Sequence, residues 1–318
     1  MKLGIVGAGM IAQEVLQVLK EIPAIQVLGI VTRESSYEKL APIAAAHHIP
    51  HTYQTYAQLL ANPDIDTIYI ANYNNLHFEF AVQAITAGKH VIIEKPIVLH
   101  ASQVADIHQL AKTHQVIVLE AVNLLHLPSY HKIKELLPLL GDVKVVSCNY
   151  SQYSSRYLRF LAGEILPAFD VSMGGGALMD INVYNLNFII GLFGAPVSAS
   201  YAPNLAEEVD TSGIMSMTYD SFQATAIGAK DANGPNICVI QGNKGYIEMS
   251  APISVMEKVT LHLNGQEPVV YQLNEGKHRL YHEFVAFADI IEKADYERAY
   301  QLQVISQQVM DVIERSRA

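Results

Sequence analysis

The chain has 318 residues, of which 50% are hydrophobic and 16% are charged. This composition excludes a disordered protein, because disordered chains lack the apolar surface that offsets the entropy cost of ordering. The length predicts two domains. The formal net charge of −10 repels nucleic-acid phosphates and anionic lipids, so we expect neither as a partner.

Cysteine content and hydropathy bear on the compartment. Cys148 and Cys238 are the only cysteines, too few for a disulfide-dense secreted scaffold or a thiolate zinc site, so we expect a reducing, cytoplasmic environment. The residues around Leu3 do not resemble a secretory signal. The most apolar stretch, residues 177–197, contains Asp180 and three asparagines, which are costly at membrane depth. We interpret it as a buried helix and expect no membrane span.

Short apolar runs alternate with amphipathic segments in the first 120 residues. This alternation predicts βαβ units and a doubly wound parallel sheet, an α/β fold with ligands bound at the carboxyl ends of its strands. The predicted strands are 3–6, 26–31, 67–71, 90–94 and 116–120, and the predicted helices are 11–20, 37–47, 78–87 and 102–114.

The pattern changes after residue 121. Apolar runs separated by turn signals such as Asn264-Gly265 predict antiparallel strands. We therefore expect an α+β domain over residues 122–318, with a large, open and mostly antiparallel sheet. The predicted strands are 143–153, 209–229, 236–249 and 257–272, and the predicted helices are 176–190 and 278–315.

A glycine turn follows the first predicted strand in the sequence GAGMIA, residues 7–12. Gly7 permits a tight turn, Gly9 lets the backbone approach a pyrophosphate, and Ala12 allows close packing of the helix, whose amino terminus attracts phosphate. An ordinary strand-to-helix turn is the alternative. The position at the start of a βαβ unit favours a dinucleotide-binding Rossmann domain over residues 1–121.

The second predicted strand ends in Thr32-Arg33 rather than in the acidic residue typical of NAD sites. A short hydroxyl side chain followed by a guanidinium suits a 2′-phosphate, so we expect NADP as the preferred cofactor. The neighbouring Glu34 leaves NAD open. The alternative for Arg33 is a solvated surface charge.

Three further residues suit proton transfer. Lys95 precedes Pro96, which favours an extended backbone, and lies at the end of a strand in the expected cofactor crevice. Asp180 and Tyr184 are four residues apart and share a helical face, after three consecutive glycines. A nearby cation such as Lys95 makes a tyrosine a usable proton relay. A surface lysine, a structural aspartate and a core tyrosine are the alternatives.

Together these motifs resemble the Gfo/Idh/MocA oxidoreductases, in particular the branch of glucose-fructose oxidoreductase and dimeric dihydrodiol dehydrogenase. The resemblance implies a Rossmann domain followed by an open-sheet domain, through which we expect a homodimer or homotetramer to form. The motifs are the glycine turn, ANYNNLH at 71–77, AGKHVIIEKP at 87–96 and GGGALMDINVY at 174–184.

The resemblance also implies site residues. Lys95 matches the catalytic lysine, Tyr184 the proton donor or acceptor of that branch, and Asp180 a residue that positions them. The substrate contacts it suggests are Asn123, His126, Arg156 and Tyr157. The expected cofactor contacts are Gly7, Gly9, Met10, Ile11, Thr32, Arg33, Ala71, Asn72, Asn74, His77, Glu94 and Lys95.

Several positions depart from the family pattern. Asn72 and Tyr73 replace the usual Thr-Pro, and Asn123 and Leu125 replace the Trp and Arg of dihydrodiol-type relatives, which indicates a changed substrate pocket. Asn182 replaces a glycine and is expected to add a polar group near the site. A histidine cluster at 47–51 has no flanking carboxylate or cysteine set, so we expect no metal.

The sequence thus predicts a metal-free oxidoreductase. It would transfer a hydride between a nicotinamide and a carbinol or carbonyl carbon of a small polyhydroxylated substrate, such as a sugar, polyol or vicinal diol. One alternative is a cofactor-binding regulator or sensor without turnover. Another is an NAD-linked inositol or sugar dehydrogenase, which a histidine at position 184 and an acidic residue at position 32 would have favoured.

Overall fold

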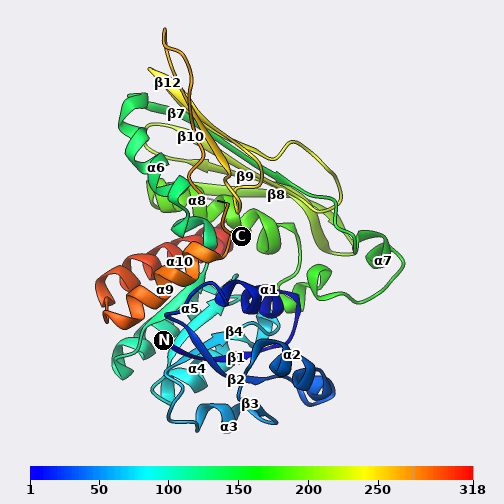
Figure 1. Cartoon of the computed structure of the whole chain (residues 1–318). Helices are drawn as coiled ribbons and strands as arrows, with labels where there is room; N and C mark the ends of the chain where they lie inside the picture. Colours follow the sequence, from blue (N-terminus) through cyan, green and yellow to red (C-terminus); the bar gives the residue numbers. More distant parts are fainter. Residues whose placement is uncertain (275, 318) are drawn as a thin grey trace. The chain divides into compact units, whose positions relative to one another are not determined.

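The computed structural model describes residues 1–274 and 276–317 and divides into two compact units (Figure 1). The first unit contains Met1–Ala121 and Leu280–Gln307, and the second contains Val122–Arg279 and residues 308–317. Positions 275 and 318 of the predicted second domain lie outside the described residues.

The first unit is built on a six-stranded parallel sheet, as predicted, in the order β3-β2-β1-β4-β5-β6. Because β1 lies between β2 and β4, the strand order reverses at the end of β1, which is where such sheets bind ligands. The strands are β1 (Lys2–Val6), β2 (Gln26–Val31), β3 (His51–Tyr53), β4 (Thr67–Ile70), β5 (His90–Glu94) and β6 (Val118–Ala121). The helices between them are α1 (Met10–Leu19), α2 (Leu40–His47), α3 (Tyr56–Leu60), α4 (His77–Thr86) and α5 (Ala101–His114).

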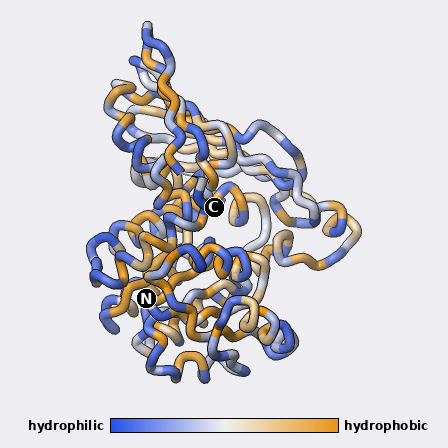
Figure 2. Tube along the Cα trace, in the orientation of Figure 1, coloured by the Kyte–Doolittle hydropathy of each residue, from blue (hydrophilic) through white to orange (hydrophobic). Residues whose placement is uncertain are grey.

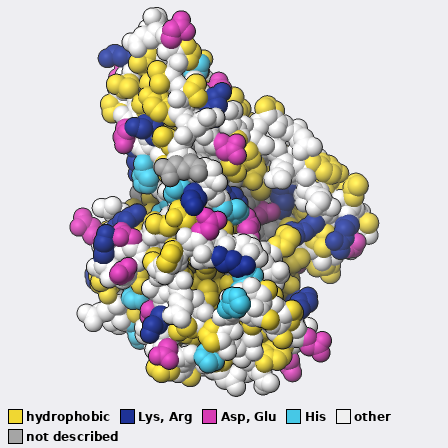
Figure 3. Space-filling view, in the orientation of Figure 1, with side chains coloured by type: hydrophobic (Ala, Val, Ile, Leu, Met, Phe, Trp, Pro, Cys, Tyr) yellow, Lys and Arg dark blue, Asp and Glu magenta, His cyan; other side chains and the backbone are white. Residues whose placement is uncertain are grey.

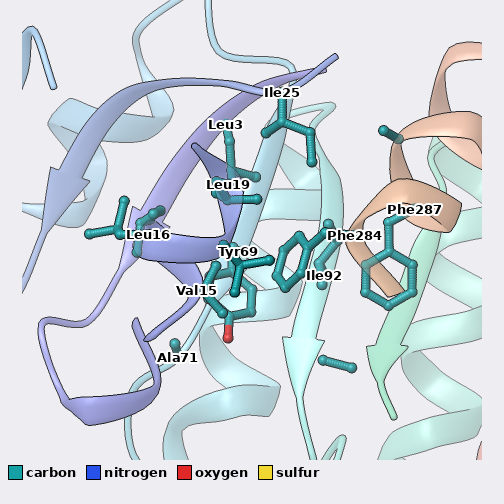
Figure 4. Close-up of a cluster of buried hydrophobic side chains, with 14 of the residues drawn as sticks. Leu3, Val15, Leu16, Leu19, Ile25, Tyr69, Ala71, Ile92, Phe284 and Phe287 are labelled. Atoms are coloured by element: carbon teal, nitrogen blue, oxygen red, sulfur yellow. The ribbon is translucent and has the colours of Figure 1, made fainter. Parts of the chain in front are cut away.

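Helix α9 (Tyr281–Glu292) and most of helix α10 (Tyr296–Ser316) belong to the first unit. Phe284 and Phe287 of α9 are fully buried in the core of that unit, and the Phe284 ring meets Tyr69 of β4 edge-on at 5.5 Å (Figure 4). The Gln303 side chain of α10 donates to the Val118 carbonyl. This differs from the predicted range 122–318, because the apolar face of α9 is buried against the first sheet.

The second unit contains an eight-stranded sheet in the order β14-β13-β12-β11-β7-β10-β9-β8. Only β7 and β10 pair in parallel, so the predicted mostly antiparallel sheet is confirmed. Its central strands are β7 (Val143–Ser151), β9 (Val209–Thr218), β10 (Gln223–Ala229), β11 (Ile237–Gly242), β12 (Gly245–Ser250) and β13 (Lys258–Leu263). The sheet ends in β14 (Val269–Tyr271), and the turn before β14 is hydrophilic (Figure 2).

The edge strand β8 (Ser198–Ala206) was not predicted from the sequence. Its run of small and polar residues, with Pro203 near the middle, is typical of a loop. An edge strand tolerates proline because one side of its backbone needs no partner within the sheet. The pairing of β8 with β9 therefore decides its conformation.

Helices α6 (Pro128–Leu136) and α8 (Val183–Phe193) cover one face of this sheet (Figure 1). By length and composition Val171–Phe193 could span a membrane, but 72% of its most apolar window is buried inside the protein, as expected for a core helix. Asn182 is fully buried and donates to the Ala226 carbonyl of β10. The amide thus attaches the helix to the sheet, and the expected polar contribution of Asn182 near the site stays a prediction.

Cys148 and Cys238 face each other on β7 and β11 and form a disulfide bond. The sequence analysis did not predict this pairing. It depends on the register between two strands that are 90 residues apart in the chain.

Candidate functional site

The glycine turn brings three strand ends together. Gly7 has a φ of 116°, and a Cβ there would lie 2.4 Å from the Ala71 carbonyl oxygen. The Gly7 N–H donates to the Val31 carbonyl, and the Ala71 N–H donates to the Val6 carbonyl. Only glycine fits this junction of β1, β2 and β4.

Gly9 precedes α1, and a Cβ added there would meet no protein atom within 4 Å. The next residue, Met10, is 73% exposed, and Ile11 is half-buried. The amino terminus of α1 is thus open, with N–H groups that can receive an anion.

Arg33 follows β2 and is held by two side chains. Its Nη1 donates to the Tyr73 hydroxyl at 3.0 Å and its Nε to Ser36 Oγ at 3.1 Å, while the guanidinium carbon lies 5.5 Å from the centre of the Tyr73 ring. Thr32 beside it is half-buried. Tyr73, one of the departures from the family pattern, thereby orients the predicted phosphate-binding arginine.

Asn72 provides a test of whether a ligand fits at this edge of the sheet. Within residues 1–274 and 276–317, neither polar atom of its buried amide has a hydrogen-bond partner. Buried amides are rarely left unsatisfied, so a polar ligand is the expected partner. Ala71 is buried, and Asn74 begins a turn of 3-10 helix, Asn74–Leu76, that leads into α4.

The turn after β5 is fixed from three sides. The Lys95–Pro96 peptide bond is cis. His77 Nδ1 donates to the Pro96 carbonyl at 3.0 Å, since that oxygen can only accept, and the Ile97 N–H donates to Glu120 Oε1 at 2.9 Å. Glu94 accepts hydrogen bonds from the Tyr69 hydroxyl and from the Lys95 N–H.

Two acid–base groups at this turn have shifted pKa values. Desolvation lowers the pKa of the fully buried His77 imidazole to about 4, against the opposing effect of its backbone hydrogen bonds. Desolvation raises the pKa of Glu120 to about 7, although hydrogen bonds from Ser306 and Ile97 lower it; the Glu94 charge raises it further and Lys95 opposes it. His77 holds the turn carrying Lys95 through its hydrogen bond to Pro96, and its predicted contact with a cofactor stays a prediction.

The glycines at 174–176 are required by close contacts within the second unit. A Cβ on Gly175 would lie 2.5 Å from the Asp170 nitrogen, and one on Gly176, where φ is 106°, would lie 2.0 Å from Asp210 Oδ1. The other oxygen of Asp210 accepts hydrogen bonds from the Leu178 N–H and the Tyr201 hydroxyl. This partner of the glycine segment was missed, because nothing near Asp210 in the sequence marks it.

Asp180 lies in a single turn of π-helix, Leu178–Asn182, and Tyr184 lies in the first turn of α8. π-turns within helices are frequent at functional sites. Asp180 Oδ2 is 2.8 Å from the ammonium of Lys230, and the Asp180 side chain is 35% exposed. Tyr184 is half-buried, and its ring lies 6.1 Å from that of Tyr150.

The predicted substrate residues differ in their surroundings. Asn123 is 1% exposed, and its amide nitrogen donates to the Ser254 and Arg279 carbonyls, while its Oδ1 has no hydrogen-bond partner within the described residues. Its contact with a substrate stays a prediction. His126 is also buried. Arg156 is exposed just before helix α7 (Tyr157–Leu161), and the Tyr157 ring packs against Phe160 and Phe169. Hydrophobic side chains around α7 are exposed among charged ones (Figure 3).

With this geometry in view, comparison with known proteins identifies the family. Residues 1–122 match the model described as "Oxidoreductase family, NAD-binding Rossmann fold", and residues 130–248 match the "GFO/IDH/MocA C-terminal domain". The chain belongs to the Gfo/Idh/MocA oxidoreductase family. It is accordingly an NAD(P)-dependent oxidoreductase whose first unit is an NAD(P)-binding Rossmann domain.

Several members of the Gfo/Idh/MocA family resemble this chain over most of their length. It is 31% identical over 295 residues to an NADP-dependent scyllo-inositol 2-dehydrogenase of Bacillus subtilis, covering 92% of this chain and 88% of the relative. It is 31% identical over 274 residues to a trans-1,2-dihydrobenzene-1,2-diol dehydrogenase of Xenopus tropicalis, covering 84% and 79%. A 3-ketoreductase of Actinomadura kijaniata, solved with NADP and TDP-benzene, shares the fold with a TM-score of 0.84 at 21% identity, covering 99% and 97%.

The residues fit the dinucleotide that this family uses. The open amino terminus of α1 beside Gly9 suits a pyrophosphate, and the unsatisfied amide of Asn72 offers a donor and an acceptor at the same edge of the sheet. Arg33 keeps further N–H groups beyond those bound to Ser36 and Tyr73, and it lies at the end of β2, where an adenosine ribose is expected. No group of three or more metal-ligating side chains occurs within the described residues.

Proposed function

We propose that this chain is an NADP-preferring dehydrogenase or reductase that acts on a CH–OH or carbonyl group of a small polyhydroxylated substrate. The observation that carries the proposal is the ionic pair of Asp180 with Lys230, which keeps a partly exposed carboxylate four residues from Tyr184 on a π-turn and α8. A protein that only bound the cofactor would have no need of these proton-transfer groups together with Lys95.

The relatives support this substrate class. One acts on an inositol, one on a vicinal diol and one is a 3-ketoreductase solved with a nucleotide bearing a benzene group. The first two names describe a carbinol carbon that has a second hydroxyl on a neighbouring carbon. We extend that chemistry to this chain and include sugars and polyols.

Tyr184, Lys95 and Asp180 have different roles in the proposed proton transfer. The nicotinamide supplies the hydride donor or acceptor when bound. In the oxidation direction, Tyr184 reacts as the phenolate and accepts the substrate hydroxyl proton, and the Lys95 ammonium stabilises negative charge that develops on the substrate oxygen. Asp180 orients these groups. The hydrogen bonds of His77 and Glu120 around residues 96 and 97 hold the turn that presents Lys95.

The preference for NADP rests on the fixed position of Arg33. A guanidinium held by the Tyr73 hydroxyl and Ser36 Oγ loses less side-chain entropy when it pairs with a 2′-phosphate, so its charge-assisted hydrogen bonds contribute more to binding. The adjacent Thr32 can donate a further hydrogen bond.

We also propose a homodimer or homotetramer formed through the open face of the second sheet. The strand register places Val145, Ile214 and Tyr246 on the same face, and all three are between 37% and 46% exposed. Exposed apolar residues in this arrangement are typical of an interaction surface. Ile214→Asp should reduce the molar mass measured by light scattering to that of one chain, whereas an unchanged mass would exclude this face.

The test of the activity follows the absorbance of the reduced nicotinamide with NADP and NAD in parallel. The substrate panel contains aldoses, inositols, polyols and vicinal diols, with the corresponding carbonyl compounds for the reverse reaction. Turnover with a member of the panel supports the proposal. Tight NADP binding with no turnover across the panel would instead support a cofactor-binding regulator, and faster turnover with NAD would favour an NAD-linked sugar or inositol dehydrogenase.

A further inference from the structure

Lys230 is a buried lysine at the end of β10, and sequence analysis gave no indication of its role. The residue is 2% exposed. Its Nζ lies 2.8 Å from Asp180 Oδ2, donates to the Ala168 carbonyl and sits 4.2 Å from the centre of the Phe169 ring. A carboxylate, a carbonyl and an aromatic face thus surround one ammonium group.

The backbone of Lys230 is anchored as firmly as its side chain. Its N–H donates to the Thr211 carbonyl at 2.8 Å, and its own carbonyl accepts from the Ser154 N–H at 2.8 Å. The starting point of the side chain is therefore fixed on both sides. A long side chain with a fixed base and several partners at its tip has little rotational freedom left to lose when a neighbour binds.

Lys230 and Asp180 differ in solvent exposure, and this difference indicates which of the two residues positions the other. The Lys230 side chain is 3% exposed, while that of Asp180 is 35% exposed. Burying an ammonium is costly unless an opposite charge and further hydrogen bonds compensate it. Lys230 therefore requires Asp180 as an anion, and it fixes Oδ2 of that carboxylate while the Asp180 side chain remains 35% exposed.

We propose that Lys230 is a positioning residue that acts through Asp180, holding its carboxylate charged and in one orientation toward the reacting groups. Because Lys230 also binds the Ala168 carbonyl and the Phe169 ring, it ties the segment before the three glycines to the same carboxylate. The inference rests on the proposed function, because it assumes that Asp180 serves the reaction.

The test is a double-mutant cycle on the full-length protein with the best substrate of the panel. Lys230→Met should lower kcat about tenfold or more, with the NADPH dissociation constant changed less than about twofold. In the Asp180→Asn background, the same change should lower kcat less than about threefold, because the group through which Lys230 acts is already lost. Lys230→Arg, which keeps the charge, should recover part of the loss, and the exposed Lys244→Met is the matched control.

Thermal unfolding supplies a readout that needs no turnover. Asp180→Asn leaves the buried ammonium without this carboxylate, so its melting temperature should fall, and adding Lys230→Met should raise it again. A non-additive melting temperature verifies the ion pair, whereas a merely structural lysine would leave the effects of the two substitutions on kcat additive.

The outcomes separate the two proposals. Wild-type turnover that Lys230→Met leaves unchanged, or additive effects across the cycle, would overturn the role of Lys230 and leave the activity intact. Undiminished turnover in Asp180→Asn would overturn this inference and the assigned role of Asp180 while leaving the activity intact. No turnover by the wild type would overturn the proposed function and this inference with it.

Discussion

Glu120→Gln is the substitution for which the structure gives the most definite magnitude. Glu120 accepts hydrogen bonds from the Ile97 N–H at 2.9 Å and from Ser306 Oγ at 2.5 Å. A glutamine oxygen can accept from Ile97, and its amide can donate to Ser306 Oγ, whose hydrogen can turn to the Leu302 carbonyl at 3.4 Å. The variant therefore keeps the contacts and loses only the ability to ionise.

The magnitude follows from the pKa of Glu120, which desolvation raises from 4.5 to about 7. The folded carboxyl keeps its proton to higher pH than the unfolded one, so the wild-type free energy of unfolding falls as the pH rises from about 4.5 to 7. This difference in the pKa of Glu120 between the unfolded and folded states corresponds to about 3 kcal/mol, and the partial exposure of Glu120 reduces the expectation to about 2 kcal/mol.

His77 changes the free energy of unfolding with pH in the opposite direction to Glu120, so the wild type and Glu120→Gln have to be compared. Desolvation lowers the pKa of His77 to about 4, so its contribution to stability is lost as the pH falls from about 6.5 to 4. Both proteins contain this histidine, and the difference between their unfolding free energies removes it. As the pH rises from 4.5 to 8, the free energy of unfolding of Glu120→Gln should increase by about 2 kcal/mol relative to that of the wild type.

The assay is urea unfolding followed by far-UV circular dichroism, since the chain contains no tryptophan. Glu292→Gln, an exposed change at the end of α9, is the control for the removal of one carboxylate. Parallel curves for Glu120→Gln and the wild type across this pH range would refute the reasoning, because they would mean that Glu120 titrates equally in both states.

Five other substitutions test three separate parts of the structure. Lys95→Met should abolish turnover while the NADPH dissociation constant, measured by nicotinamide fluorescence, changes less than about threefold; retained turnover would remove Lys95 from the catalytic groups. Arg33→Ala should weaken NADPH binding at least about tenfold more than NADH binding, and Tyr73→Phe should do so to a smaller extent, so equal losses for both cofactors would exclude a phosphate contact. Gly176→Ala should lower the free energy of unfolding by about 2–4 kcal/mol, because it adds a steric clash to an unfavourable positive φ. Gly163→Ala, with φ of 84° and open space around it, should cost only about 1–2 kcal/mol in the same urea titration.

Local signals predicted much of the fold. The glycine turn at Gly7 and the alternation of strands and helices indicated the Rossmann domain, because both depend on residues close together in the chain. The GGG segment before Asp180 likewise indicated a close approach, which the structure locates at Asp170 and Asp210. Strand β8 was missed because its neighbours in the sheet, rather than its own residues, decide its conformation.

The contacts that hold the candidate site residues in place could not be predicted from local sequence signals. Tyr73 meets Arg33 across 40 residues, and Lys230 follows Asp180 by 50 positions, so no local pattern connects either pair. Glu120 resembles any acidic residue at the end of a strand until its contacts with Ile97 and Ser306 are known. Long-range contacts of this kind follow from the tertiary arrangement alone.

The contribution of α9 and α10 to the first unit has a consequence for synthesis on the ribosome. The six strands of the first sheet emerge by residue 121, yet Phe284 and Phe287, which complete its core, are translated more than 160 residues later. At a translation rate of about 5–20 residues per second, Phe284 and Phe287 are added roughly 8 to 30 seconds after the last strand of the first sheet. During this interval the apolar side chains of the first sheet that pack against Phe284 and Phe287 in the folded protein lack these partners.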